Sequence, residues 1–233
     1  CFVREPAQQI RSHFEHFCRG HGYKKTFNEF IQEQRFINFQ SKHLRGVPVD
    51  AIGFIGLTES YDESLEMINK EFGLSILVAH INQNKNKSSS LYEFSNEDLE
   101  LIKELNEEDY ALYEKIQNLF ERRMACKKSG LPFYRGELTL QALPKPQRGK
   151  FIHGWLMSFD TDAPAKGYVT INDHVTVNVE AKDYRPWVKE KVGHRMGFVG
   201  FYVKLPQELN AYDLVSLYDQ NGHLIDNFVF EGE

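Results

Sequence analysis

Apolar side chains recur every three or four residues from Ile10 to His21, which predicts a helix that ends by Gly20 to Gly22. Thr26 is followed three residues later by Glu29, a capping-box pattern that predicts the start of a second helix. Residues 36–44 mix polar and apolar positions and fit either a helix or an irregular segment. The first part of the chain therefore begins with helices that have one apolar face.

Apolar runs and helical patterns alternate in the next part of the chain. Residues 51–57 form an apolar run between polar residues and predict a buried parallel strand, and residues 62–72 predict the helix after it, closed by Gly73. Residues 75–81 predict another apolar strand, and residues 96–124 show long helical periodicity. This alternation favours an α/β fold with a parallel sheet.

The pattern changes at residues 127–130, where Gly, Pro and basic residues replace the helical periodicity. We therefore expect two domains, at residues 1–130 and 137–233. Short segments rich in Val, Phe, Tyr and Thr follow, separated by Asn, Asp and Gly turns, of which Asn221-Gly222 is the strongest hairpin signal. They predict a small antiparallel β-sandwich with strands near residues 137–143, 151–159, 167–171, 174–179, 197–205, 214–219 and 224–230.

Composition narrows the class of protein. The 233 residues are 41% hydrophobic, enough for one large or two small cores, and no apolar run approaches the roughly 20 residues of a membrane span. The net charge of −5 argues against general nucleic-acid binding. Three cysteines, odd in number and without metal-ligand spacing, favour free thiols in a reducing compartment, so we predict a cytoplasmic protein.

The first residues form a junction that can hold a phosphate. A short apolar strand runs through Arg4-Glu5-Pro6 into a helix that carries Ser12. A helix start presents unpaired N–H groups and a positive dipole end, and an arginine beside it adds a planar donor fork suited to phosphate oxygens. Ser12 lies about two turns further on and meets the same anion only if the ligand lies along the helix. A solvated arginine at an ordinary strand-to-helix turn is the alternative.

This segment resembles the 3′-phosphate-binding segment of sulfotransferases that use 3′-phosphoadenosine 5′-phosphosulfate, especially carbohydrate enzymes related to the heparan sulfate 2-O-sulfotransferases. The family often has Asp where this chain has Glu5, and a helical Arg where it has Gln8 or Gln9, a role that Arg11 could take. Further blocks follow in the family's order. They are Asn38-Phe39-Gln40-Ser41-Lys42-His43-Leu44, the segment from Gly53 to Leu65 with Thr58-Glu59, and Asp109-Tyr110-Ala111-Leu112-Tyr113.

The resemblance implies the C-terminal part of a P-loop-like, three-layer sulfotransferase fold. It implies that Arg4 and Ser12 bind the 3′-phosphate of the cosubstrate, and that the polar loop with Lys85, Lys87 and Ser88 closes over the nucleotide; a plain solvated linker is the alternative for that loop. The family's 5′-phosphosulfate loop, and usually its catalytic base, precede these blocks, and no such loop occurs in this sequence. We therefore expect an N-terminally incomplete enzyme, inactive alone, with its catalytic residues upstream of Cys1.

Several histidines, Glu59 and aromatic side chains are further candidates for contact with a ligand. The histidines near position 13 lack further ligands at a recognisable spacing, so we predict no metal, and His13 is expected on the helix surface or a pocket wall. His43 is a candidate for contact with the acceptor, and Glu59 either faces a ligand or caps the next helix. The sandwich resembles accessory modules of bacterial glycan-modifying enzymes. We expect Trp155 in its core and leave Trp187 open between core packing and sugar stacking, a role also open to Tyr168 and Tyr184.

Two functions from different classes follow from these patterns. The first is transfer of a sulfuryl group from 3′-phosphoadenosine 5′-phosphosulfate to a carbohydrate hydroxyl, with this chain carrying the 3′-phosphate-binding half. The second is a non-catalytic glycan-binding or scaffolding protein that keeps part of the same fold. A P-loop nucleotide hydrolase is disfavoured, because the sequence has no Walker lysine and no paired carboxylates for Mg²⁺.

Overall fold

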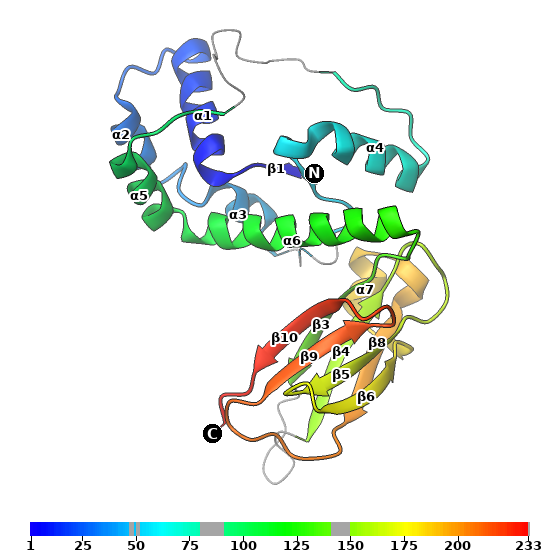
Figure 1. The fold of residues 1–233 in the computed structure, drawn as a ribbon. Coiled ribbons are helices and arrows are strands. Elements are labelled where there is room, and N and C mark those ends of the chain that lie inside the picture. The colour runs from blue at the N-terminus through cyan, green and yellow to red at the C-terminus, as the bar shows by residue number, and fades with distance from the viewer. Residues whose placement is uncertain (47–48, 50–51, 80–90, 141–149, 233) are drawn as a thin grey trace. The chain divides into compact units, whose positions relative to one another are not determined.

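The structure, a computed structural model, describes residues 1–46, 49, 52–79, 91–140 and 150–232. The chain forms two compact units (Figure 1). We call Cys1–Val47 with Phe54–Glu121 the helical unit, and Pro48–Gly53 with Arg122–Glu233 the sandwich unit.

The helical unit surrounds a very small parallel sheet. Strand β1 (Phe2–Val3) pairs with β2 (Gly56–Leu57), so that Phe2 lies opposite Gly56 and Val3 opposite Leu57. The other elements are α1 (Pro6–Gly20), α2 (Phe27–Ile31), α3 (Phe39–Leu44), the 3-10 turn η2 (Thr58–Ser60), α4 (Tyr61–Phe72), α5 (Asn96–Leu105) and α6 (Glu107–Ser129), which ends in the sandwich unit. Mixed helix and sheet is confirmed, but within the described residues the parallel sheet has two strands only.

The core of the helical unit lies between α1, α2 and α5. Phe30 is fully buried and stacks on Phe36 with ring centres 4.0 Å apart. The capping box that starts α2 is confirmed, because the Thr26 hydroxyl accepts from the Glu29 N–H and the Glu29 carboxylate accepts from the Thr26 N–H. The other buried apolar members of this core are Ala7, Ile10, Ile31 and Ile102.

In the helical unit, three elements of the structure differ from those that the sequence predicts. Of the strand predicted at residues 51–57, the described residues 52–57 form a strand only at β2. The strand predicted at 75–81 is wrong where it is described: residues 75–79 are irregular, and Leu77 is 85% exposed. Gly73, at φ +62°, ends α4, and the side chain of Asn69 then bonds both the N–H and the C=O of Ile76, so a side chain takes the backbone groups that a sheet would use.

The long helix predicted at residues 96–124 is divided into α5 and α6 by Asn106. This asparagine is fully buried, and its side chain donates to the Ile102 carbonyl while its Oδ1 accepts from the Asn38 N–H. Asn and Asp side chains compete with the helix for backbone groups in this way. A local polar side chain therefore breaks a helix that the apolar pattern alone predicts as continuous.

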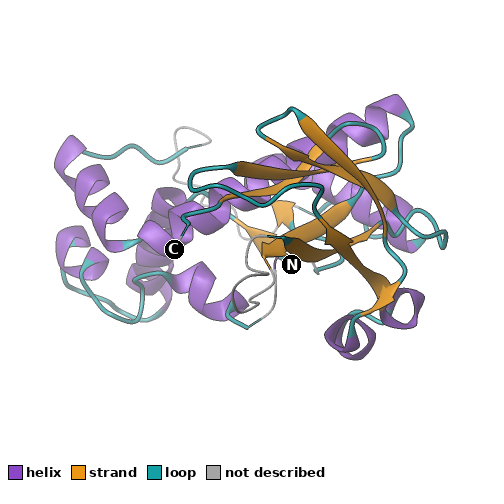
Figure 2. Ribbon diagram, turned by 90° about the horizontal axis from the view of Figure 1, so that it is seen from below, coloured by secondary structure: helices purple, strands orange, loops and turns teal. Residues whose placement is uncertain are grey.

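The sandwich unit is antiparallel, as predicted. One sheet has the order β10-β9-β5-β6 and the other β3-β4-β8-β7. Figure 2 draws the strands in orange. The strands are β3 (Arg135–Leu140), β4 (Phe151–Met157), β5 (Lys166–Ile171), β6 (Val175–Glu180), β7 (Asp183–Tyr184), β8 (Phe198–Lys204), β9 (Leu214–Asp219) and β10 (Leu224–Val229). The short strand β7, helix α7 (Pro186–Lys191) and the 3-10 turn η3 (His194–Gly197) are elements that the sequence pattern did not predict.

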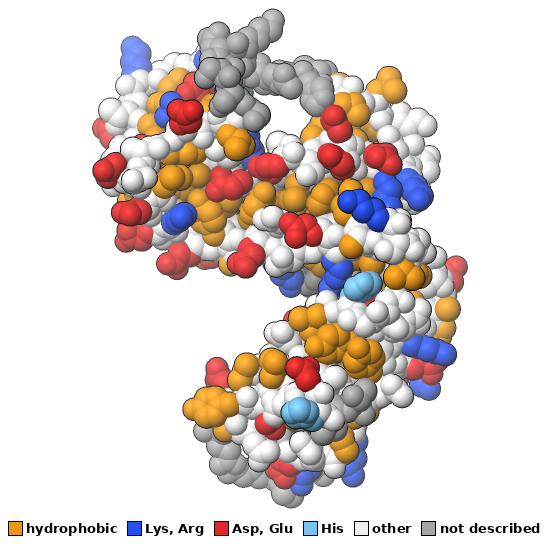
Figure 3. Space-filling view, viewed as in Figure 1, with side chains coloured by type: hydrophobic (Ala, Val, Ile, Leu, Met, Phe, Trp, Pro, Cys, Tyr) orange, Lys and Arg blue, Asp and Glu red, His pale blue; other side chains and the backbone are white. Residues whose placement is uncertain are grey.

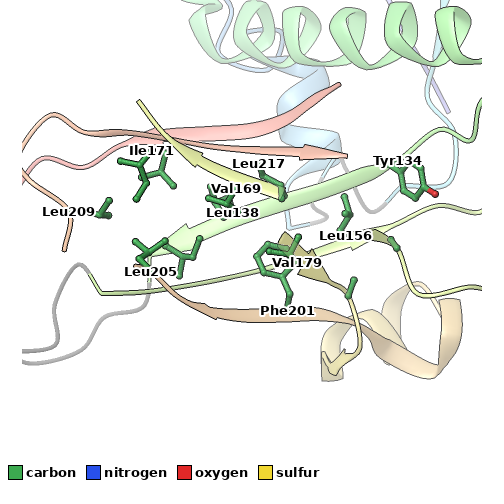
Figure 4. Close-up of a cluster of buried hydrophobic side chains, with 14 of the residues drawn as sticks. Tyr134, Leu138, Leu156, Val169, Ile171, Val179, Phe201, Leu205, Leu209 and Leu217 are labelled. Atoms are coloured by element: carbon green, nitrogen blue, oxygen red, sulfur yellow. The ribbon is translucent and has the colours of Figure 1, made fainter. Parts of the chain in front are cut away.

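The inner faces of the two sheets meet in one core. Leu138, Leu156 and Phe201 come from one sheet and Val169 and Leu217 from the other (Figure 4). The predicted hairpin at Asn221-Gly222 joins β9 to β10, with Gly222 at φ +85°. Alternation of apolar and polar positions with turn residues between them therefore predicted the antiparallel strands of this unit other than β7, but not α7 or η3.

Candidate functional site

The junction between β1 and α1 lies where the two parallel strands end, the edge at which open α/β sheets place ligands. Glu5 caps α1, because its carboxylate accepts the Gln8 N–H at 2.7 Å. The Glu5 N–H in turn donates to Glu59 Oε1 at 3.0 Å. Glu59 therefore contacts the start of α1 and makes no side-chain cap for α4, which corrects the capping alternative.

Arg4 extends from this junction. Its Nε lies 4.0 Å from Glu59 Oε1, its Cζ lies 5.7 Å from the centre of the Tyr92 ring, and its side chain is 19% exposed. Within the described parts of the chain, no residue forms a hydrogen bond with the guanidinium of Arg4. An arginine has five N–H donors in a planar fork, so this group can still bind an anion.

The side chain of Gln8 links α1 to Tyr92 by two hydrogen bonds. The Gln8 amide donates to the Tyr92 carbonyl at 3.0 Å and accepts from the Tyr92 N–H at 2.8 Å, and Gln8 is 7% exposed. Ser12 lies one turn beyond Gln8 on the same face of α1 and is half-buried. Arg4 therefore lies over the Tyr92 ring, and Ser12 lies one helical turn from the glutamine that binds the Tyr92 backbone.

The other predicted cofactor residues, Lys85, Lys87 and Ser88, lie outside the described residues. Arg11, considered as a substitute for the family's helical arginine, pairs with Glu15 at 3.1 Å and lies over the Phe27 ring at 4.6 Å. It is therefore engaged along the helix and not at the junction.

The backbone of Arg4 is held by a residue from another block of the sequence. Gln40 accepts from the Arg4 N–H and donates to the Arg4 carbonyl, both at 2.8 Å. Asp109, 2% exposed, holds α3 in turn by accepting the N–H groups of Gln40 at 3.1 Å and Ser41 at 2.7 Å. The sequence blocks at 38–44 and 109–113 thus meet behind Arg4. Their motifs were recognised, but pairing with Arg4 required the tertiary structure.

Two tyrosines of α6 lie against the acidic residues of the junction. Burial raises the pKa of the Tyr110 and Tyr113 hydroxyls, and the carboxylates of Glu5 and Glu59 raise it further. Both tyrosines therefore stay protonated at neutral pH, and Tyr113 donates to Glu59 at 3.4 Å. Because Arg4 pairs with Glu59 at the junction, an incoming phosphate competes with Glu59 for Arg4.

Two histidines flank Phe39. The His13 ring lies edge-on to the Phe39 ring, with ring centres 4.6 Å apart. The His43 ring is tilted against the Phe39 ring, with ring centres 4.2 Å apart, and His43 Nδ1 lies 2.7 Å from the Phe39 carbonyl oxygen. Burial lowers the pKa of His13, and the charges of His16, His43 and Arg4 lower it further. His13 is therefore neutral at pH 7 and packs on Phe39, as does the exposed His43.

Acidic side chains gather over α5 and the start of α6 on the face seen in Figure 3. Glu97, Glu100, Glu107 and Glu108 are exposed there. This surface repels a polyanion, so an anionic ligand is expected elsewhere. No set of three or more His, Cys, Asp or Glu side chains that could hold a metal ion occurs within the described ranges, and no helix there is long and apolar enough to cross a membrane.

A scan against protein-family models and searches of curated proteins and of solved structures found no match for the chain. The contacts of the chain's own residues therefore carry the argument for function. The most informative of them surround Arg4, which combines a half-buried guanidinium, a fixed backbone and a position at the end of a parallel strand.

Proposed function

We propose that this chain carries the donor-binding part of a sulfotransferase that uses 3′-phosphoadenosine 5′-phosphosulfate and a carbohydrate acceptor. The observation that carries the proposal is the guanidinium of Arg4, which lies beside the start of α1 and has no hydrogen-bond partner in the described chain. It lies 5.7 Å from the Tyr92 ring, and Gln8, one turn before Ser12 on α1, binds the backbone of Tyr92. In this proposal Arg4 and Ser12 bind the 3′-phosphate. The parallel pairing of β1 with β2 supports the three-layer, P-loop-like fold for this part of the chain.

Charge and geometry at the junction suit a phosphate. The guanidinium of Arg4 can donate two N–H groups to one phosphate. The Glu5 carboxylate already caps the start of α1, so Arg4 supplies the positive charge for the anion. Glu59 holds Arg4 only through a 4.0 Å ion pair, which a doubly charged phosphate can replace. Lys85, Lys87 and Ser88 are proposed as further contacts to the nucleotide.

In the reaction that we propose, an oxygen of the acceptor sugar bonds to the sulfur while the bond from sulfur to the bridging oxygen of the 5′-phosphate breaks. A base takes the proton of the acceptor hydroxyl, and adenosine 3′,5′-bisphosphate leaves. The residues of this chain hold the donor by its 3′-phosphate, which aligns the reacting atoms. His43 is proposed on the acceptor side.

A non-catalytic glycan-binding protein remains the second candidate. It is favoured by an observation in the sandwich unit, a pocket lined by two tryptophans, a tyrosine and charged side chains. The two candidates differ in one testable property, because only the first requires a 3′-phosphorylated nucleotide to bind at Arg4.

Calorimetric titration with adenosine 3′,5′-bisphosphate tests the proposal, with adenosine 5′-monophosphate as the ligand that lacks the 3′-phosphate. Arg4→Ala is expected to weaken the bisphosphate about tenfold or more, because it removes charge-assisted hydrogen bonds, and to leave the monophosphate unchanged. Ser12→Ala is expected to weaken it less.

Arg11→Ala is the matched control, since Arg11 also lies on α1 but pairs with Glu15. It is expected to bind like the original chain. Equal binding of the bisphosphate by Arg4→Ala and the original chain, or no binding by the original chain at millimolar nucleotide, would show that the assignment is wrong.

A further inference from the structure

A pocket of about 330 Å³ lies on the outer face of the sheet β3-β4-β8-β7. It belongs entirely to the sandwich unit and is separate from the Arg4 junction. Its size is at the lower end of the range of small-molecule sites, with room for about one sugar ring. Three aromatic side chains and three ionisable ones line most of it, namely Trp155, Trp187, Tyr202, Glu137, His153 and Arg185.

The strand pattern explains how these residues come together. Along β4, Ile152 and Leu156 enter the core, and alternation places His153 and Trp155 on the opposite face. Strand register then sets Tyr202 opposite His153 and Glu137 opposite Trp155.

Helix α7 contributes Trp187 to the lining of the pocket. Its second residue, Trp187, packs edge-on against Trp155 with ring centres 5.5 Å apart and an angle of 79°. Trp155 is 3% exposed and is confirmed as a core residue, whereas Trp187 is half-buried. Tyr202 is 47% exposed and stacks on Phe151, which fixes the orientation of its ring.

Arg185 forms part of the floor. Its Nη2 donates to the carbonyls of Gly154 at 3.0 Å and Phe201 at 2.9 Å. A Cβ on Gly200 would lie 2.7 Å from Arg185 Nε, so the glycine is what allows the guanidinium to lie against the strand. Within the described ranges, no residue bonds the N–H groups on Nε and Nη1, which leaves them for a ligand.

Glu137 and His153 add hydrogen-bond acceptors to the lining that contains Arg185. The Glu137 carboxylate accepts from Trp155 Nε1 at 3.1 Å through one oxygen only. Burial and the neighbouring Arg185 lower the pKa of His153, so this ring is neutral at pH 7 and can both donate and accept. The pocket therefore combines aromatic surface with converging donors and acceptors of opposite charge.

We infer that this pocket binds a pyranose ring of a polysaccharide, with its C–H face on Tyr202 and Trp187 and its hydroxyls on Glu137, His153 and Arg185. A sugar ring has this combination of an apolar face and a hydroxyl rim. A purely apolar ligand would leave Nε and Nη1 of Arg185 and the second carboxylate oxygen of Glu137 without a ligand partner. The inference rests on the second candidate function and deepens it, because it names the site and the ligand class of the glycan binding; it does not depend on nucleotide binding at Arg4.

The tryptophans of the chain provide a fluorescence signal for this test. Its two tryptophans, Trp155 and Trp187, both line the pocket, so intrinsic tryptophan fluorescence reports on this site. The full chain is titrated with cellohexaose as a neutral probe and with hexagalacturonate as an anionic one. We expect a saturable change in fluorescence with at least one probe, and the responding probe shows whether Arg185 recognises a carboxylate or a hydroxyl.

Tyr202→Ala is expected to weaken binding up to about tenfold through loss of ring stacking, and its exposure means that the fold tolerates the change. Tyr212→Ala is the matched control, because Tyr212 is an 81% exposed tyrosine of the same unit that does not line the pocket. Tyr212→Ala and Arg4→Ala are both expected to bind the oligosaccharide probes like the original chain. Unchanged oligosaccharide binding by Arg4→Ala distinguishes this pocket from the proposed nucleotide site at Arg4. No response to either probe, or equal weakening by Tyr202→Ala and Tyr212→Ala, would overturn the inference.

Discussion

Asp109 caps a helix from which it is distant in the sequence. The N-cap residue of α3, Asn38, has a left-handed backbone and makes no side-chain cap, and Asp109 takes its place by accepting two N–H groups of the first turn. Because Gln40 in α3 holds the backbone of Arg4, the orientation of the candidate phosphate ligand depends on this buried carboxylate.

Asp109→Ala is expected to lower the free energy of unfolding by about 1 to 3 kcal/mol, since it leaves two buried or half-buried N–H groups without partners. Urea unfolding followed by ellipticity measures the change. Glu104→Ala, at an exposed position of α5, serves as control and is expected to shift stability by no more than about 0.5 kcal/mol. Equal effects of the two substitutions would contradict the capping role.

Asp213 gives the sandwich unit a pH dependence. Its carboxylate accepts the Asn210 N–H and the Asn172 amide, each at 2.7 Å, and these bonds lower the pKa of Asp213 below its usual range. A folded pKa below the unfolded one stabilises the fold above the unfolded pKa, about 3.9, and this contribution is lost as the pH falls through the folded pKa.

Asp213→Asn is therefore expected to be less stable than the original chain near neutral pH, with a difference that shrinks as the pH falls below about 4. Thermal unfolding midpoints across this pH range measure it. The exposed Asp162 provides the comparison as Asp162→Asn, for which we expect no such convergence. A constant difference at all pH values would show that the hydrogen bonds of Asp213 do not depend on its charge.

At the scale of elements, close approach between strands decides where glycine is required. A Cβ on Gly154 in β4 would contact the Glu137 carbonyl oxygen of β3 and would lie 2.5 Å from Cζ of Phe201, a ring that is 1% exposed. The backbone of the neighbouring strand cannot move aside without breaking the pairing of β3 with β4.

Gly154→Ala is expected to cost roughly 1 to 3 kcal/mol or more, which is the usual range for overpacking a core. Gly20→Ala is the matched substitution at the end of α1, where the nearest atom lies 3.9 Å away, and it is expected to leave stability unchanged or raised. Thermal shift of both variants is the measurement. A smaller loss for Gly154→Ala than for Gly20→Ala would contradict the strand geometry.

Elements whose cause is local were predictable from the sequence. The capping box at Thr26 and the hairpin turn at Gly222 use residues only a few positions apart, and both are confirmed. The exposed segment 75–79 was not predictable as such, because its apolar residues are typical of a strand while the Asn69 side chain takes the backbone groups of Ile76.

At the scale of the whole molecule, the chain has separate cores in its two units. The core around Phe30 belongs to the helical unit and the core around Val169 to the sandwich unit. Helices α1 to α5 all lie in the helical unit, and both tryptophans lie in the sandwich unit. Two optical probes can therefore follow the two units separately.

We expect far-UV ellipticity and tryptophan fluorescence to give two distinct unfolding transitions in urea, since each unit buries its own apolar core. Asp109→Ala is expected to move mainly the ellipticity transition, and Gly154→Ala mainly the fluorescence transition. Coincident transitions that move together in both variants would show that the chain unfolds as one cooperative unit.

The sequence by itself determined the sandwich strands other than β7, the capping box of α2 and the presence of Arg4 at a strand-to-helix junction, because each depends on periodicity or on neighbours within a few residues. Only the tertiary structure decided which distant residues surround Arg4, and that Glu137, Arg185, Trp187 and Tyr202 line one pocket. The physical reason is that hydrogen bonds from Gln40 and Gln8, and the register between strands, join residues far apart in the sequence, and no local pattern encodes such a partner.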